Sequence, residues 1–145
     1  MSVHFPDMGP GVRGVPAASA ELRIEHPYTF RIYPARNLVC LTISGFWNEA
    51  MVDSFAIALR EAIGALGREP GEHRLCCDVS FAAIQSQDVI KRFQALIAAG
   101  PTHAHKLALW TSRPLSRMQS RRLLAVRDNI AVFDAEEEAL RWLAD

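Results

Sequence analysis

Three serines near the ends of predicted strands are the first residues in this sequence that could do chemistry. Ser80, Ser86 and Ser112 stand in the same part of the predicted fold as the carboxylates of Asp78 and Asp88. A hydrolytic site needs a serine, a base and an orienting acid within hydrogen-bond reach of one another. The candidate histidine bases precede a predicted strand, at the opposite edge, and no Gly-x-Ser-x-Gly elbow is present. The serines are therefore expected to cap helices, and no enzyme is predicted.

Histidines that stand close together in the chain could bind a metal ion. His103 and His105 are separated by one residue, and His73 precedes the stretch that we predict to be the central strand. Metal ligation needs several nitrogens or carboxylates converging on one point, and this spacing does not require such convergence. We expect loop histidines exposed to solvent, with no metal and no cofactor.

A stripe of arginines on a predicted helix offers positive charge. Arg113, Arg117 and Arg121 recur every four residues. Such a stripe could hold a phosphate, an anionic headgroup or an acidic partner, or it could simply be a solvated helix face. No aromatic residues are interleaved with it, which argues against nucleic acid as a partner.

Two adjacent aromatic residues, Phe46 and Trp47, follow the second predicted strand. They could pack against the next helix as a hydrophobic staple, or line a pocket or a dimer contact at the edge of the sheet. We expect Phe46 to pack, whereas the role of Trp47 stays open between these alternatives.

The elements that must position these residues are organised around a stretch at residues 74–80. Leu75, Cys76 and Cys77 form an apolar run without polar alternation, which is typical of a strand covered on both faces. Ser86 is a candidate N-cap of the helix that follows, because its hydroxyl can accept a hydrogen bond from a first-turn N–H group. Ligands and partners of open α/β sheets meet loops at the carboxyl ends of strands, so this edge is the expected functional region.

The remaining pattern completes an α/β domain. Residues 28–33 alternate between apolar and polar side chains, and should pair antiparallel with the strand at residues 38–44. Asn48 and Pro114 are expected to begin helices, and Asp134 with Glu137 has the spacing of a capping box before the last helix. The predicted order is ββαβαβαβα, a five-stranded, mainly parallel mixed sheet with about four helices, in which only the first strand is antiparallel.

Length and composition set the class of protein. The chain has 145 residues, is half hydrophobic and has a formal net charge of zero, which predicts one folded domain without a strong field for nucleic acid. Residues 1–20, rich in proline and glycine, are expected to be an extended or disordered arm, and residues 21–145 the single domain. Three cysteines cannot form a disulfide framework, which favours a reducing cytoplasm. No apolar run approaches the roughly 20 residues that span a bilayer, so no integral membrane segment is expected.

Three stretches carry a resemblance to a known family. Leu41-Thr-Ile-Ser-Gly-Phe46 leads into the first helix, Leu75-Cys-Cys-Asp-Val-Ser80 is an apolar strand ending in polar residues, and the last stretch, Val132 to Leu143, contains Phe-Asp, Glu-Ala and Trp-Leu. Together they resemble the SpoIIAA-like family of small bacterial proteins, which are related to the STAS-like anti-sigma-factor antagonists. The resemblance covers roughly residues 27–144 and implies a SpoIIAA-like, STAS-like fold.

The resemblance also implies a function, although one motif is missing. Anti-sigma-factor antagonists of this type bind a partner kinase and are phosphorylated on a serine in an Asp-Ser-Ser-Gly loop before the second helix. The equivalent positions here are Ser86, Gln87 and Asp88, with no Ser-Ser and no Gly. Phosphorylation at that position is therefore not predicted.

These observations favour a non-enzymatic regulatory or protein-binding module. The alternative is a carrier of a small apolar or lipid-like ligand, with Trp47 at a pocket between helices and the arginine stripe at an anionic headgroup. A homodimer is a further expectation, because a small domain has a sheet edge to cover. The candidate binding residues are Trp47, Asp78, Ser80, Ser86, Gln87, Asp88, Ser112, Arg113 and Arg117.

Overall fold

The computed structural model describes residues 27–69, 71–99, 103–122 and 129–145. In chain order its elements are β1 (Tyr28–Tyr33), the 3-10 turn η2 (Pro34–Arg36), β2 (Leu38–Gly45), α2 (Glu49–Gly64), β3 (Arg74–Ala82), α3 (Gln87–Ala98), β4 (Lys106–Trp110), α4 (Pro114–Arg121), β5 (Ile130–Phe133) and α5 (Glu136–Ala144). The expected arm at residues 1–20, and its boundary with the domain, lie outside the described residues.

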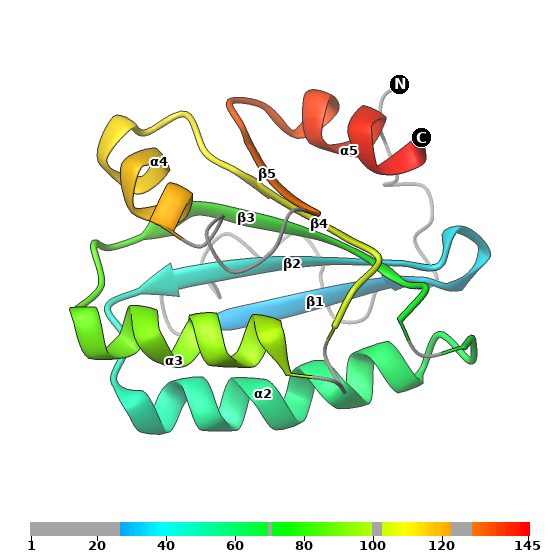
Figure 1. Cartoon of the computed structure of the whole chain (residues 1–145), viewed down its shortest axis with the longest axis horizontal. Helices are drawn as coiled ribbons and strands as arrows, with labels where there is room; N and C mark the ends of the chain where they lie inside the picture. Colours follow the sequence, from blue (N-terminus) through cyan, green and yellow to red (C-terminus); the bar gives the residue numbers. More distant parts are fainter. Residues whose placement is uncertain (1–26, 70, 100–102, 123–128) are drawn as a thin grey trace.

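The strands of the described residues form one five-stranded sheet in the order β1-β2-β3-β4-β5 (Figure 1). β1 pairs antiparallel with β2, and the pairs β2–β3, β3–β4 and β4–β5 are parallel. This arrangement confirms the predicted sheet and places β3 at its centre. The carboxyl ends of β2, β3 and β4 consequently meet at one edge, here called the carboxyl edge, and their beginnings meet at the amino edge.

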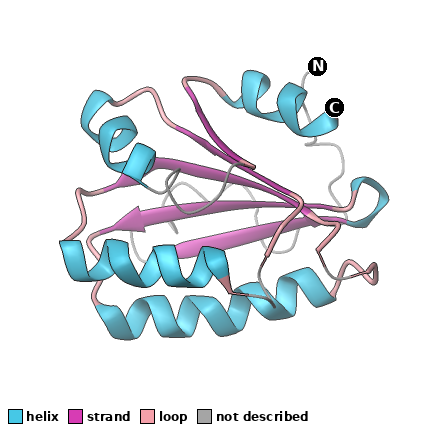
Figure 2. Ribbon diagram, viewed as in Figure 1, coloured by secondary structure: helices cyan, strands magenta, loops and turns pink. Residues whose placement is uncertain are grey.

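Helices cover both faces of the sheet (Figure 2). α2 and α3 pack on one face against alternate strand residues such as Leu41, Cys77 and Leu109. α5 packs on the other face, where Cys76 and Ala108 are buried under it. Neighbouring strand residues point to opposite faces, which is why the run at Cys76 and Cys77 contains no polar residue.

The helix starts follow the expected capping chemistry in three of four cases. The Asn48 side chain accepts a hydrogen bond from the N–H of Met51, and Ser86 accepts one from Val89. Pro114 occupies the first turn of α4, where its missing N–H leaves no unpaired donor. The capping box expected at Asp134 is wrong.

Asp134 does not cap α5, because its carboxylate has another partner. The N-cap of α5 is Ala135, which makes no side-chain capping bond, and helical residues begin at Glu136. The Asp134 carboxylate instead forms an ion pair with Arg117 of α4. A cation on a neighbouring element has replaced the local N–H group as the partner of this carboxylate.

Candidate functional site

The carboxyl edge is held together by one glutamine that sequence analysis did not select. The side-chain Nε2 of Gln85 donates hydrogen bonds to the carbonyl oxygens of Gly45 (2.8 Å) and Ala83 (2.7 Å). Its Oε1 accepts a hydrogen bond from the backbone N–H of Trp47 (2.8 Å). The loop after β3 is thereby joined to the turn between β2 and α2.

A second glutamine joins α4 to the same loop. The backbone N–H of Gln85 donates to Oε1 of Gln119 (2.9 Å), and Nε2 of Gln119 donates to the Gln85 carbonyl (2.8 Å). The Gln119 side chain thus pairs with both backbone groups of Gln85, as a residue of a neighbouring strand would. Three segments that are far apart in the sequence therefore form one connected surface.

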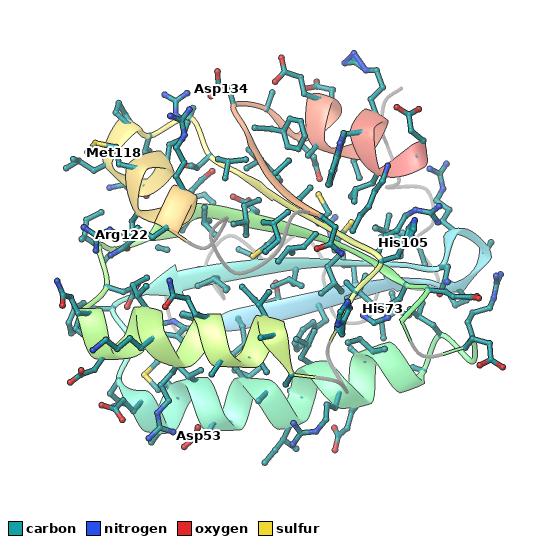
Figure 3. All side chains as sticks on the ribbon, viewed as in Figure 1. Asp53, His73, His105, Met118, Arg122 and Asp134 are labelled. Carbon is teal, nitrogen blue, oxygen red and sulfur yellow. The ribbon has the colours of Figure 1, made fainter. Side chains whose placement is uncertain are left out.

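The arginines of the predicted stripe are partly used by the fold itself. Arg113 donates through Nη1 to the carbonyl of Ser80 (2.8 Å), which ties the start of α4 to the end of β3. Arg117 is paired with Asp134, and Arg121 and Arg122 are exposed. Figure 3 shows Met118, Arg122 and Asp134 at this end of the molecule. Within the stripe, Arg113 and Arg117 therefore have partners in the fold, whereas Arg121 is exposed to solvent.

Large apolar side chains are exposed at this edge. Among the described residues, six large hydrophobic side chains are exposed, and five of them belong to the carboxyl edge. Those five are Phe46 (64 %), Phe81 (49 %), Ile84 (46 %), Leu115 (64 %) and Met118 (65 %). The sixth, Ile57, lies on α2. We call the five residues the apolar surface.

The structure reverses the expected roles of the two adjacent aromatic residues. Phe46, which was expected to pack, is exposed, so that prediction is wrong. Trp47 is only 1 % exposed, and its Nε1 donates to the Ser44 carbonyl (2.8 Å). Its ring lies 5.4 Å from the rings of both Phe55 and Phe93. Trp47 is therefore a core residue that fixes the turn, and it cannot be a surface contact.

Two of the candidate residues, Asp78 and Ser86, have local structural partners. Oδ1 of Asp78 accepts the N–H of Ser80 (2.9 Å), and Ser86 Oγ caps α3 by accepting from Val89 (3.2 Å). Ser112 is an exposed residue before α4. These hydroxyls are not aligned with an imidazole base.

The histidines of the described residues lie at the amino edge, where His103 and His105 are exposed as expected, whereas His73 is buried and that part of the expectation is wrong. The backbone N–H of His105 donates to the His73 carbonyl (2.8 Å), directly before β4 and β3 begin. Figure 3 shows both labelled side chains at the end of the molecule opposite α4. Within the described ranges, no group of three or more His, Cys, Asp or Glu side chains could hold a metal ion.

The first turn of α3 presents two more of the candidate residues to solvent. Gln87 and Asp88 are both exposed, directly beside Ser86. Asp88 complements the positive end of the helix dipole. All three stand next to Gln85, so they border the apolar surface.

An apolar cavity of about 100 Å³ lies between the sheet and the helices α2, α3 and α4. Leu41, Val79, Ile90, Phe93 and Leu109 form part of its apolar wall. Gln85 and Gln119 line it as well, together with Ser116 and Ser120 of α4. The cavity therefore reaches the glutamine pair of the carboxyl edge, and Trp47 contacts its wall through the phenyl rings rather than lining it.

Burial makes two of the cysteine thiols unreactive. A hydrogen bond with Cys40, followed by burial, raises the pKa of the Cys76 thiol well above its usual value. Burial is the main cause that raises the pKa of Cys77. Both thiols are therefore protonated at neutral pH and behave as small apolar side chains, as expected from the sequence.

One carboxyl group on the α5 face is also perturbed. Burial is the main cause that raises the pKa of Glu136, and the negative charges of Asp78 and Glu137 raise it further, against an opposing effect of Arg31. Asp78 thus faces α5, on the side of the sheet away from the cavity. The candidate residues Asp78 and Ser86 consequently do not share one pocket.

Several solved structures resemble this chain, and two of them are informative about its fold. An uncharacterised protein from Shewanella loihica PV-4, of the DUF3478 family, superposes with a TM-score of 0.63 at 15 % identity, over 81 % of this chain and 94 % of its own. It has a SpoIIAA-like fold. The present chain has the same SpoIIAA-like fold. An anti-sigma factor antagonist from Mycobacterium paratuberculosis superposes with a TM-score of 0.56 at 13 % identity, over 81 % of this chain and 95 % of its own.

The SpoIIAA-like fold expected from the sequence is thereby confirmed. No protein-family model matches the chain, and no curated protein matches it either. In the part of the chain that the structure describes, no helix has both the length and the apolar character needed to cross a membrane.

Proposed function

We propose that this protein is a non-enzymatic binding module of the STAS-like type that docks a partner protein on its carboxyl edge. The observation that carries the proposal is the apolar surface, whose five exposed side chains all come from the ends of β2, β3 and β4 or from the segments that follow them. Exposed apolar groups gathered in one region of a soluble domain are typical of protein-binding sites. The resemblance to the antagonist from Mycobacterium agrees with a partner-binding role. It is an analogy at the level of the fold alone, so the proposal does not depend on it.

The charge around the apolar surface indicates the kind of partner. Arg121 at the end of α4 and Arg122, which caps it, are exposed, and Arg113 is exposed while bound to Ser80. Arginines at the rim of an apolar contact pair well with carboxylates, and opposite charges at the rim speed association. The partner is therefore expected to present apolar side chains bordered by aspartate or glutamate.

The connected glutamines make this edge suitable for docking. Gln85 and Gln119 fix the three segments relative to one another before any partner arrives. A surface that is already ordered loses less conformational entropy on binding. The three described cysteines are free and buried, which fits the cytoplasm that we propose as its compartment.

The test uses a matched pair of surface variants. Leu115→Asp/Met118→Asp places charge in the apolar surface, whereas Ile57→Asp places charge on an equally exposed apolar side chain of α2. Proteins retained from a host extract by the wild type and by Ile57→Asp, but lost from the double variant, would be partners of this edge. Retention of the same proteins by all three forms would contradict the proposal. A concentration-dependent mass that the double variant abolishes would identify a second copy of the chain as the occupant instead.

The cavity favours a second candidate function, a carrier of a small apolar ligand. An empty apolar cavity of about 100 Å³ costs on the order of 2 kcal/mol of stability, and apolar cavities of similar size accept small hydrophobic molecules. Its wall is mostly aliphatic or aromatic, and its polar residues are Ser116, Ser120, Asn129 and the two glutamines. A short alkyl chain or a single ring would match these dimensions.

Native mass spectrometry of protein purified gently from its host tests this second candidate. Ser120→Leu would fill the cavity, and Ser112→Ala, which changes an exposed residue outside it, is the control. A carrier should retain an added mass in the wild type and in Ser112→Ala but not in Ser120→Leu. An unliganded mass in all three forms would rule out a retained ligand in the cavity.

A further inference from the structure

The helix α4 turns polar side chains toward the inside of the molecule and apolar side chains toward solvent. Its buried residues are Ser116 and Ser120, whereas Leu115 and Met118 are 64 % and 65 % exposed. A surface helix of a globular protein normally has the opposite pattern, with its apolar side chains against the core. The proposed docking surface accounts for the exposed apolar residues, so the buried serines need an explanation of their own.

The two serines border the apolar cavity of about 100 Å³. Ser116 and Ser120 are only 6 % and 8 % exposed, and neither hydroxyl makes a hydrogen bond within the part of the chain that the structure describes. Small residues can let a helix pack closely on a sheet, but the space beside these two is a cavity. Because burying a hydroxyl without a partner is unfavourable, a ligand explains the pair better than packing does.

The amide side chains at the cavity are already used by the fold. Oε1 and Nε2 of Gln119 are bound to the backbone of Gln85 (2.9 and 2.8 Å), and the Gln85 side chain is bound to three backbone groups of the carboxyl edge. Asn129 lies at the amino edge, where its Nδ2 donates to the carbonyls of Ala104 (2.8 Å) and His105 (2.6 Å) and its Oδ1 is buried without a partner. On the α4 side, the groups that a ligand could bind are therefore the serine hydroxyls.

The wall opposite α4 is apolar. It includes Cys77, Val79 and Leu109 of the sheet and Ile90 and Phe93 of α3. None of the described residues that line the cavity carries a charge. An ionised ligand would be buried there without a counter-charge, which is strongly unfavourable. The lining therefore suits a neutral molecule that is apolar on one side and has a hydrogen-bonding group on the other.

We propose that the ligand of this cavity is a small neutral molecule with an apolar body and one hydroxyl group, which hydrogen-bonds to Ser116 and Ser120. The inference rests on the carrier function proposed above for the cavity, and adds the class of ligand and the residues that select it. Helix positions four residues apart have Cβ atoms about 5–6 Å apart, so one oxygen atom between them can reach both serines. Each serine hydroxyl can donate or accept, so the ligand hydroxyl can do both at once.

The two serines should also make the cavity selective. A site built to hydrogen-bond a hydroxyl group discriminates against the analogue that lacks it, because the polar groups of the site are then left unpaired. A cavity without such groups would have the opposite preference, because it would bury the hydroxyl of the ligand without a partner. The relative affinity for two matched ligands is therefore the quantity to measure.

The test compares phenol with toluene, which have the same number of non-hydrogen atoms and differ in a hydroxyl against a methyl group. Each is titrated into the full chain while the backbone amide chemical shifts of cavity residues such as Ile90 and Leu109 are followed. The wild type should bind phenol at least as tightly as toluene. Ser116→Ala/Ser120→Ala should shift the ratio of the two dissociation constants at least tenfold toward toluene.

Control variants separate this selectivity from effects on folding. Ser116→Ala/Ser120→Ala should stay folded, because alanine favours a helix more than serine does. Ser54→Ala/Ser112→Ala removes two exposed hydroxyls and should leave the ratio within twofold. Ser120→Leu fills the cavity and should abolish the binding of both probes.

The possible failures are distinguishable. If both probes bind and the ratio is the same in the wild type and in Ser116→Ala/Ser120→Ala, the inference is overturned while the carrier function stands. If neither probe binds saturably, the carrier function fails and the inference fails with it. Binding of both probes to Ser120→Leu would place them outside the cavity and would also overturn the inference.

Discussion

The two edges of the sheet use the same residue type in different ways. At the carboxyl edge, Arg113 donates to the Ser80 carbonyl and Arg117 forms an ion pair with Asp134. At the amino edge, Arg68 donates to the Pro34 carbonyl, whereas the half-buried Arg74 has an Nε without a hydrogen-bond partner, and neither has an ion pair among the described residues. The comparison indicates that an arginine points to a ligand only when its guanidinium group has no partner within the protein.

The largest expected effect is a difference in the free energy of unfolding between variants of the two adjacent aromatic residues, Trp47 and Phe46. Trp47→Ala should lower the free energy of unfolding by about 3–5 kcal/mol, because it opens a cavity among buried aromatic rings. Phe46→Ala should change it by less than about 0.5 kcal/mol, because that side chain is exposed. Urea denaturation measures both. Similar losses in the two variants would mean that Phe46 is not an exposed residue.

The next effect concerns the glutamine that connects the carboxyl edge. Gln85→Ala removes three side-chain hydrogen bonds and leaves the buried N–H of Trp47 and the half-buried carbonyl of Ala83 without these partners. We expect a loss of about 2–3 kcal/mol in the free energy of unfolding. Gln87→Ala, two residues later and exposed, is the matched control and should cost less than about 0.5 kcal/mol. Equal costs would show that this edge is not held by Gln85.

A smaller effect compares arginines from the two edges directly. Arg117→Gln breaks the exposed ion pair with Asp134 and should cost about 0.5 kcal/mol of stability at low salt. Arg68→Gln removes an exposed hydrogen bond to the Pro34 carbonyl and also relieves repulsion with Arg74, so the two effects oppose each other and stability should change by less than about 0.5 kcal/mol. Both differences should shrink in 1 M salt, where charges are screened. A clear loss of stability from Arg68→Gln would argue against this balance of effects at the amino edge.

The smallest effect is a pH dependence on the α5 face. Because the pKa of Glu136 is raised in the folded protein, folding favours its protonated form. Its contribution to stability is therefore greatest below the unfolded pKa and is lost as the pH rises through the folded pKa. Glu136→Gln should raise the melting temperature at pH 7 by on the order of 1 °C, and the gain should vanish near pH 4. A gain at pH 4 that equals the gain at pH 7 would contradict this assignment.

Local patterns predicted the fold well because each depends on neighbouring residues. The apolar run at Cys76 and Cys77 identified the central strand, and the hydrogen-bonding side chains of Asn48 and Ser86 identified two helix starts. The Phe46 prediction was wrong because strand alternation ends at Gly45. That residue has a positive φ of 82°, which turns the chain and exchanges the inward and outward positions.

The contacts that build both edges could not be predicted from local patterns. Gln85 bonds to residues about 34–40 positions away, and nothing in its immediate sequence marks it as a connector. A pocket at the amino edge likewise brings together Arg36, Arg74 and His105 from three segments. Asp134 had the spacing of a cap, yet the nearby cation of Arg117 binds it instead. Such competition depends on tertiary structure.

The most direct test of the central claim is an isothermal titration of the recovered partner protein against three forms of this chain. The proposed docking surface predicts that Leu115→Asp/Met118→Asp binds at least a hundredfold more weakly than the wild type. Ile57→Asp should bind as the wild type does, because its exposed side chain lies on α2, outside the apolar surface. Equal dissociation constants for the wild type and the double variant would contradict the claim that the carboxyl edge is where the partner docks.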